Sequence, residues 1–237
     1  MLLFKLPAMP KPLITIISRC VLVVILATAF GYIEAAVVVY LREIFHPDGF
    51  TFPLAPFGLT GDSHRLLLTE VGREAATIVL IFTAAFLSGQ NRQQRVAYFM
   101  TIFAVWDIFY YVWLKALIGW PGSVFDWDIL FLIPVPWAGP VLMPVLVSAA
   151  LLIFAGIILY RDCKGKPVKA GFWDWLGLCM AGVVVVITLC IPGPHISQPD
   201  YSSYFSWPLF AVGLFGATAI FAKCVLRKTP TAGVGVK

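Results

Sequence analysis

Residues 20–41, CVLVVILATAFGYIEAAVVVYL, decide the fold, because a single charged side chain, Glu34, interrupts an otherwise uncharged run. A helix that crosses a bilayer needs about 20 mostly apolar residues, and this run reaches that length. Lys5, Lys11 and Arg19 precede it, as basic residues do in a secretory signal. The apolar part nevertheless exceeds the roughly 7–15 residues of a signal peptide. We therefore expect residues 20–41 to remain as a first membrane-spanning helix.

Runs of the same kind recur along the chain, which is 60% hydrophobic and only 12% charged. A typical soluble domain is about half apolar and about a quarter charged. We predict an all-α, polytopic membrane protein, a bundle of six transmembrane helices that forms a single membrane domain over residues 1–237, with a short cytoplasmic tail at 227–237. The expected spans are residues 20–41, 66–88, 96–118, 138–160, 172–192 and 207–226.

The basic residues predict the orientation of these spans. Thirteen of the 17 Lys and Arg residues fall before the first span, in the connections after the second and fourth, or at the end of the sixth. Because Lys and Arg are retained on the cytoplasmic side, we expect both termini to be cytoplasmic, in a bacterial inner membrane. A nucleic-acid partner is not expected, since the basic residues lie at helix ends and not on one face with aromatic platforms.

Two connections on the expected outer side, residues 42–65 and 119–144, are longer than turns. The second contains Pro134, Pro136 and Pro140, which exclude one continuous helix. Its apolar run from Ile129 to Pro136 is too short to cross the bilayer. We expect an interfacial or re-entrant segment near 126–137, which either lines a cavity or rests on the lipid headgroups.

Ionisable residues inside the first three spans are the most informative feature for function. In the second span, Glu70 and Glu74 are four residues apart, so they lie on one helix face, with Arg73 beside them. At about 1.5 Å per residue, Glu34 and Glu74 lie at similar depths, about 10 and 12 Å below the outer helix ends. In the third span, one stripe carries an acid near mid-bilayer, an aromatic hydroxyl and a base, namely Asp107, Tyr111 and Lys115.

Two interpretations of this group stay open. A charge at the centre of a spanning helix costs about 2.5–3.5 kcal/mol, so pairing is expected. The structural interpretation is a salt-bridge network in which Arg73 pairs with Glu34 or Glu74, and Lys115 pairs with Asp107. The functional interpretation is a polar site, open to the outside, that binds a ligand, proton or substrate. The acids Glu34, Glu70, Glu74 and Asp107 outnumber Arg73 and Lys115, so protons or a cationic ligand would supply the balance.

A metal site is not expected; a mixed site of carboxylates with a loop histidine is the less favoured alternative. The three histidines, His46, His64 and His195, fall in expected loops beside Pro or Gly or next to a helix start, and the chain has no HExxH motif. Phosphate-binding loops and the GxSxG nucleophile motif are absent as well. The sequence identifies no cofactor.

Three functions remain open. The first is binding or transport of a cation, proton or small polar solute by the outward-facing polar site. The second is a membrane-embedded enzyme that acts on a lipid or amphipathic substrate at the outer surface, with a carboxylate as general base. The third is a non-catalytic subunit of a larger membrane complex. The partners expected are accordingly the lipid bilayer, a small polar or cationic ligand, or other subunits of such a complex.

Overall fold

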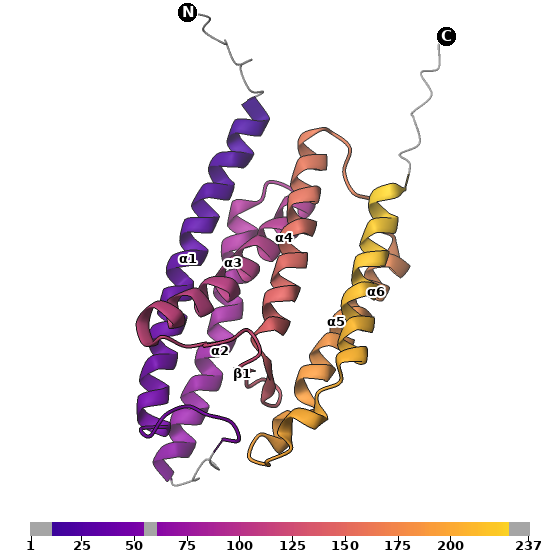
Figure 1. The fold of residues 1–237 in the computed structure, drawn as a ribbon. Helices are drawn as coiled ribbons and strands as arrows, with labels where there is room; N and C mark the ends of the chain where they lie inside the picture. The colour runs from indigo at the N-terminus through magenta and orange to yellow at the C-terminus, as the bar shows by residue number, and fades with distance from the viewer. Residues whose placement is uncertain (1–10, 55–60, 228–237) are drawn as a thin grey trace, which may run out of the picture.

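A computed structural model of the chain describes residues 11–54 and 61–227. Six helices in it are long and apolar enough to cross a membrane, which confirms the predicted multi-pass helical fold. They are listed here in chain order: α1 (Lys11–Phe45), α2 (Gly61–Ser88), α3 (Arg92–Ile118), α4 (Leu142–Cys163), α5 (Phe172–Cys190) and α6 (Trp207–Leu226). Figure 1 shows α1 to α4 side by side, with α5 and α6 as a pair beside them.

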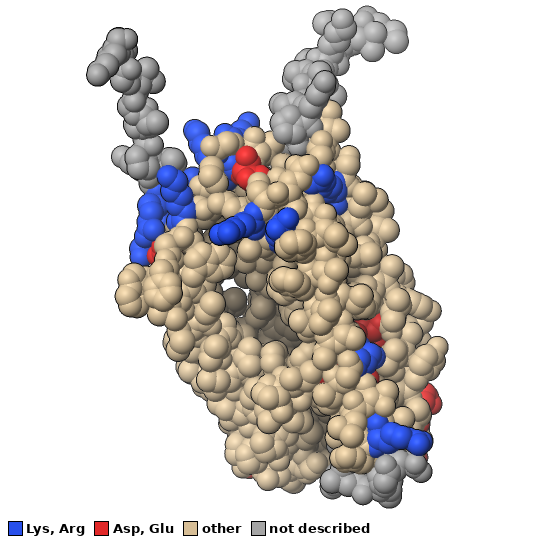
Figure 2. Space-filling view, turned by 180° about the vertical axis from the view of Figure 1, so that it is seen from behind, with Lys and Arg blue, Asp and Glu red and all other residues tan. Residues whose placement is uncertain are grey.

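Both the start of α1 and the end of α6 lie at the same end of the bundle (Figure 1). Lys and Arg gather there (Figure 2), and we call it the basic end. Asp174 binds α5 to α6 at this end, through Lys223 Nζ at 3.1 Å and Arg227 Nη1 at 2.8 Å. Asp162 similarly accepts hydrogen bonds from Asn91 and Gln94, which join α4 to the start of α3. The described part of the chain does not include Lys5, the side chains of Lys11 and Asp62, or residues 228–237.

The opposite end, the hairpin end, carries the only two strands within the described residues, β1 (Trp127–Phe131) and β2 (Trp137–Pro140). They pair antiparallel, with a register shift between Ile129 and Phe131. The tip of this hairpin packs on the short helix η1 (Gly193–His195), where a Cβ on Gly193 would meet the Pro136 carbonyl oxygen at 2.1 Å. Glycine is therefore required at this contact. A further short helix, η2 (Tyr201–Tyr204), follows η1.

The hairpin corrects two details of the prediction. Residues near 126–137 form a small antiparallel sheet, so the fold is all-α except for this element. The fourth span begins at Leu142 and not at residue 138, because Trp137–Pro140 are paired with β1. Backbone bonds from Val141 N–H to Asp126 O, 2.9 Å, and from Leu142 N–H to Val124 O, 2.8 Å, hold this transition.

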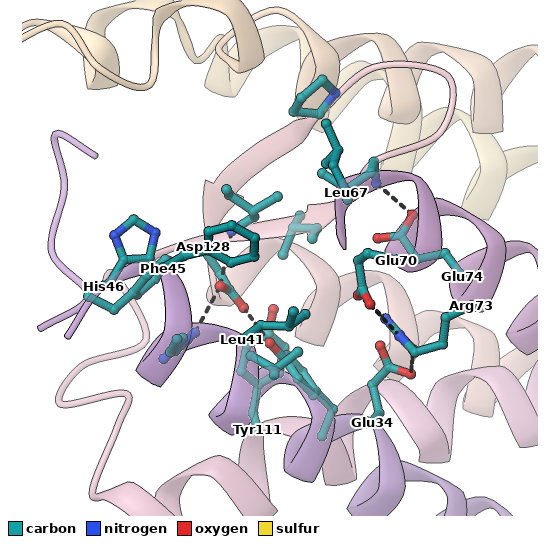
Figure 3. A pocket seen from close by; sticks show the side chains of 18 of the residues that line it. Glu34, Leu41, Phe45, His46, Leu67, Glu70, Arg73, Glu74, Tyr111 and Asp128 are labelled. Carbon is teal, nitrogen blue, oxygen red and sulfur yellow. Dashed lines mark hydrogen bonds and ion pairs between the residues drawn. The ribbon is translucent and has the colours of Figure 1, made fainter. Parts of the chain in front are cut away.

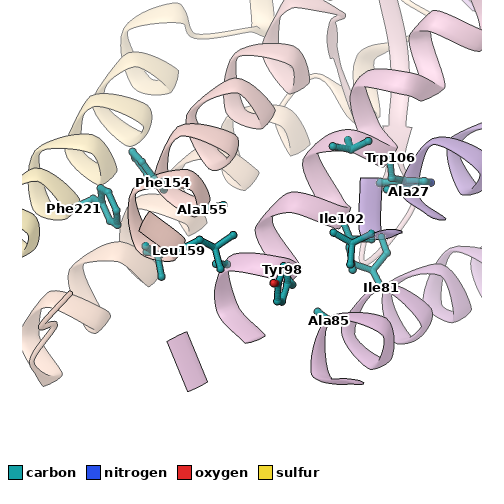
Figure 4. Packing of buried hydrophobic residues seen from close by; sticks show 14 residues of the cluster. Ala27, Ile81, Ala85, Tyr98, Ile102, Trp106, Phe154, Ala155, Leu159 and Phe221 are labelled. Carbon is teal, nitrogen blue, oxygen red and sulfur yellow. The ribbon is translucent and has the colours of Figure 1, made fainter. Parts of the chain in front are cut away.

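A cluster of buried apolar residues (Figure 4) lies in the half of the bundle nearer the basic end, since it takes in the C-terminal part of α2 and the N-terminal part of α3. Tyr98 and Ile102 of α3 are fully buried in it, against Ile81 of α2 and Ala27 of α1. Phe154 of α4 and Phe221 of α6 stack with ring centroids 4.2 Å apart. This packed half supports the polar cavity described next.

Candidate functional site

A cavity of about 330 Å³ lies between α1, α2, α3 and the hairpin. Six of the seven residues predicted for the site line it: Glu34, Glu70, Arg73, Glu74, Asp107 and Tyr111. These six come from three helices, so the fold brings together groups that are far apart in the chain. Two further charged residues also line it, Arg42 and Asp128, of which Figure 3 labels Asp128. The rest of the wall is largely apolar, with Leu41, Leu67 and Leu132 among its members.

Arg73 lies between two carboxylates of the cavity wall (Figure 3). It pairs with Glu34 of α1 and with Glu70 one turn earlier on α2; its Nε donates to Glu70 at 2.8 Å. The predicted pair with Glu34 is thus confirmed. The alternative pair with Glu74 is wrong, since adjacent residues of a helix point in directions about 100° apart, whereas residues three apart are neighbours.

Glu74 is buried and accepts a hydrogen bond at 2.9 Å from the backbone N–H of Leu132, in the turn of the hairpin. No described salt bridge involves this carboxylate. The bond joins α2 to the hairpin, so the segment that follows β1 positions Glu74. It also places in the cavity wall a carboxylate that forms no salt bridge with a described basic side chain.

Asp107 accepts a hydrogen bond at 2.7 Å from the Ser148 hydroxyl of α4. The predicted pair of Asp107 with Lys115 is wrong. Lys115 lies eight residues further along α3, about 12 Å by helical rise, and its Nζ donates instead to the carbonyls of Gly119, 2.9 Å, and Pro121, 2.8 Å. These carbonyls follow the C-terminus of α3, where a cation is favoured. Lys115 is not among the described residues that line the cavity.

The cavity wall also holds a buried ion pair that the sequence did not predict. Arg42 Nη2 lies 3.0 Å from Asp128 Oδ1, and both side chains are less than 10% exposed. The Arg42 guanidinium also packs against the rings of Phe50 and Trp120, 3.9 and 3.8 Å from their centroids. Burial raises the pKa of Asp128, while Arg42 and a 3.1 Å hydrogen bond from the Tyr110 hydroxyl oppose that rise.

Two signals in the sequence pointed to this pair. Arg42 is one of the few basic residues on the expected outer side, where Lys and Arg are depleted, so a specific partner for it is expected. Asp128 follows Trp127 at the start of an apolar segment. Neither signal identifies the partner, because 86 residues separate the two side chains. Tyr111, which was predicted, is buried beside Tyr110 with ring centroids 4.8 Å apart.

The three histidines lie apart from one another. His46 lines the cavity and its ring packs edge-on against Phe50. His64 is exposed near the start of α2, and His195 stacks on Tyr204 with ring centroids 3.7 Å apart. Among the described residues, no group of three or more His, Cys, Asp or Glu side chains could hold a metal ion.

Acid is expected to weaken the loop that carries His46. Burial and the neighbouring Arg42 guanidinium lower the pKa of His46, so the unfolded chain takes up this proton first. The stability that this histidine contributes is therefore present above its ordinary pKa of about 6.5 and is lost as pH falls below that value. His46→Gln should remove part of the acid-side loss when the free energy of unfolding is measured across about pH 5–8. The matched variant His64→Gln should keep the loss; if both variants behave alike, the prediction is wrong.

Comparison of the chain with models of protein families, with curated proteins and with solved structures finds no match. The chemistry of the cavity is therefore what indicates a function. It combines carboxylates, two guanidiniums that are already paired, and an apolar wall.

Proposed function

We propose that the protein binds a small cationic group, most directly a protonated primary amine, in the cavity between α1, α2, α3 and the hairpin. The observation that carries the proposal is the charge balance of the wall. Five carboxylates and two guanidiniums line the cavity, and both guanidiniums are occupied, Arg42 by Asp128 and Arg73 by Glu34 and Glu70. Glu74 and Asp107 remain as acceptors to which no described basic side chain is paired.

An amine suits this wall better than an inorganic cation. Ca²⁺ and Mg²⁺ require about six or more oxygen ligands around one point, whereas the lining is mostly aliphatic and aromatic. An ammonium group needs only a few acceptors, and the carbon attached to it is matched by apolar contacts such as Leu67 and Leu132. A buried carboxylate also favours a cation that shares its desolvated surroundings.

The proposal is for binding and not for conduction through the bundle. Between α1, α2 and α3, the apolar cluster around Tyr98, Ile102 and Ile81 packs between the cavity and the basic end. A continuous polar path for a solute would have to pass through this packed layer. With the basic end in the cytoplasm, as the distribution of Lys and Arg predicts, the cavity belongs to the outer half of the membrane.

Butylamine should stabilise the purified protein in lipid nanodiscs, and the uncharged isostere butanol should not. At a concentration about 100-fold above Kd, a ligand bound only by the folded state adds about 2.7 kcal/mol to the free energy of unfolding. We expect Glu74→Gln and Asp107→Asn each to weaken butylamine binding about 10- to 100-fold, the range for a hydrogen bond to a charged group. Gln and Asn still accept the bonds from Leu132 and Ser148, so the fold is retained.

Matched controls lie close by on the same side of the bundle. Glu43 and Asp48 are exposed, and neither lines the cavity as described. Glu43→Gln and Asp48→Asn should therefore bind butylamine like the unmodified protein. Equal stabilisation by butanol and butylamine, or equal binding by all four variants, would rule the proposal out.

A further inference from the structure

A second cavity, of about 400 Å³, separates the α5–α6 pair from the remaining helices. Its lining comes from α2 to α6 and from the hairpin, and Asp107 is the one charged residue among the described side chains that form it. Small residues of the pair, including Ala181, Gly213 and Ala217, leave the space open. Figure 2 shows the molecule hollowed at mid-height on this side, below the basic end.

The α5–α6 pair is held to the rest of the bundle near its ends, and this explains the gap. At the hairpin end, the Leu54 N–H donates to Ile196 O at 2.9 Å, and Gly193 lies against Pro136. Towards the basic end, Phe221 stacks on Phe154. Between these contacts the facing helices leave a space with an apolar lining, whose side chains can make dispersion contacts with a hydrocarbon chain.

The two cavities share part of their walls. Trp106, Asp107 and Leu130 line both of them. Glu74 lines the first cavity and not the second, whose described lining is apolar apart from Asp107. A molecule with a polar end and a long hydrocarbon chain matches these two neighbouring cavities. Its polar end would contact the carboxylates of the first cavity, and its hydrocarbon chain would contact the apolar lining of the second.

We propose that the ligand is a long-chain primary amine, whose ammonium group binds Glu74 and Asp107 and whose hydrocarbon chain occupies the cavity between α4 and the α5–α6 pair. This proposal rests on the proposed function, because the same carboxylates hold the amine. Six helices able to cross a membrane set the apolar cavity at the depth of hydrocarbon chains. A chain that enters sideways from the bilayer makes dispersion contacts with this apolar lining.

The test uses a long-chain alkylamine that carries a photoactivatable diazirine in its chain, added to the protein in nanodiscs. After illumination, mass spectrometry of peptides should place the adducts on cavity residues such as Val147, Leu151 and Ala217. Fewer adducts should fall on Val212 and Phe215, which lie on the exposed face of α6 and are 66% and 70% exposed. Excess butylamine should displace the probe and abolish the cavity adducts.

Two tryptophan variants of α6 form a matched pair. Ala217→Trp fills the apolar cavity and should abolish the adducts on α4, while it leaves butylamine binding intact. Val212→Trp, on the exposed face, should change neither result. The competition with butylamine needs no variant, so the test stands even if Ala217→Trp fails to fold.

The outcomes separate the two proposals. If butylamine binds but the adducts are spread evenly over the exposed surface, the apolar cavity is not the chain site and this inference alone falls. If butylamine does not bind, the proposed function falls with it. If the matching long-chain alcohol labels the cavity as well as the amine does, the space is a general lipid site, and the assignment of an amine ligand is overturned.

Discussion

Arg73→Met is expected to lower the free energy of unfolding by about 3–5 kcal/mol, the cost of leaving a buried ion pair without one partner. Arg73 pairs with both Glu34 and Glu70, whose side chains are 10% and 11% exposed. Methionine preserves much of the side-chain volume but leaves two carboxylates facing each other in an apolar wall. Titration with SDS, followed by the intrinsic tryptophan fluorescence, measures the change.

Two further variants make this prediction specific. Arg92→Met removes an exposed arginine at the start of α3 and should change the stability by less than about 0.5 kcal/mol. Adding Glu34→Gln and Glu70→Gln to Arg73→Met should recover most of the loss, because the two carboxylates that Arg73 neutralised are then uncharged. A loss in Arg73→Met no larger than that in Arg92→Met would show that the cluster contributes little to the fold.

Asp128→Leu is also expected to lower the free energy of unfolding by about 3–5 kcal/mol. Asp128 is 2% exposed and receives bonds from Arg42, from the Tyr110 hydroxyl and from its neighbouring backbone N–H. Without the Asp128 carboxylate, the Arg42 guanidinium stays buried against the rings of Phe50 and Trp120 with its charge uncompensated. The hairpin also loses its anchor to α1, so we expect faster proteolysis between β1 and β2.

The matched variant is Asp126→Leu, two residues away. Asp126 accepts hydrogen bonds from Gly122 N–H and Ser123 N–H in an exposed turn, so its loss should cost only about 1 kcal/mol, as for a capping residue. Combining Arg42→Met with Asp128→Leu should return much of the stability, because an apolar pair replaces the buried charges. Equal losses in Asp128→Leu and Asp126→Leu would contradict the assigned role of the ion pair.

The contacts of the predicted site residues show how far spacing along the chain predicts which groups meet. The bond between Arg73 and Glu70 follows from helix geometry, since residues three apart are neighbours on the same face. Helix geometry also explains why Lys115 does not reach Asp107, since the two lie more than two turns apart along α3. The bond from Leu132 to Glu74 was not predictable from spacing, because it joins α2 to the turn of a hairpin 58 residues later.

The six spans and the concentration of ionisable residues in the first three could be predicted from the amino-acid sequence. Both are local properties, since a helix crosses hydrocarbon because of the apolar length it carries. The hairpin of residues 127–140, the pair of Arg42 with Asp128 and the contact of Asp107 with Ser148 became visible in the folded chain alone. A buried charge pairs with whichever group the packing of distant segments brings within about 3 Å, and residue spacing within one helix does not contain that information.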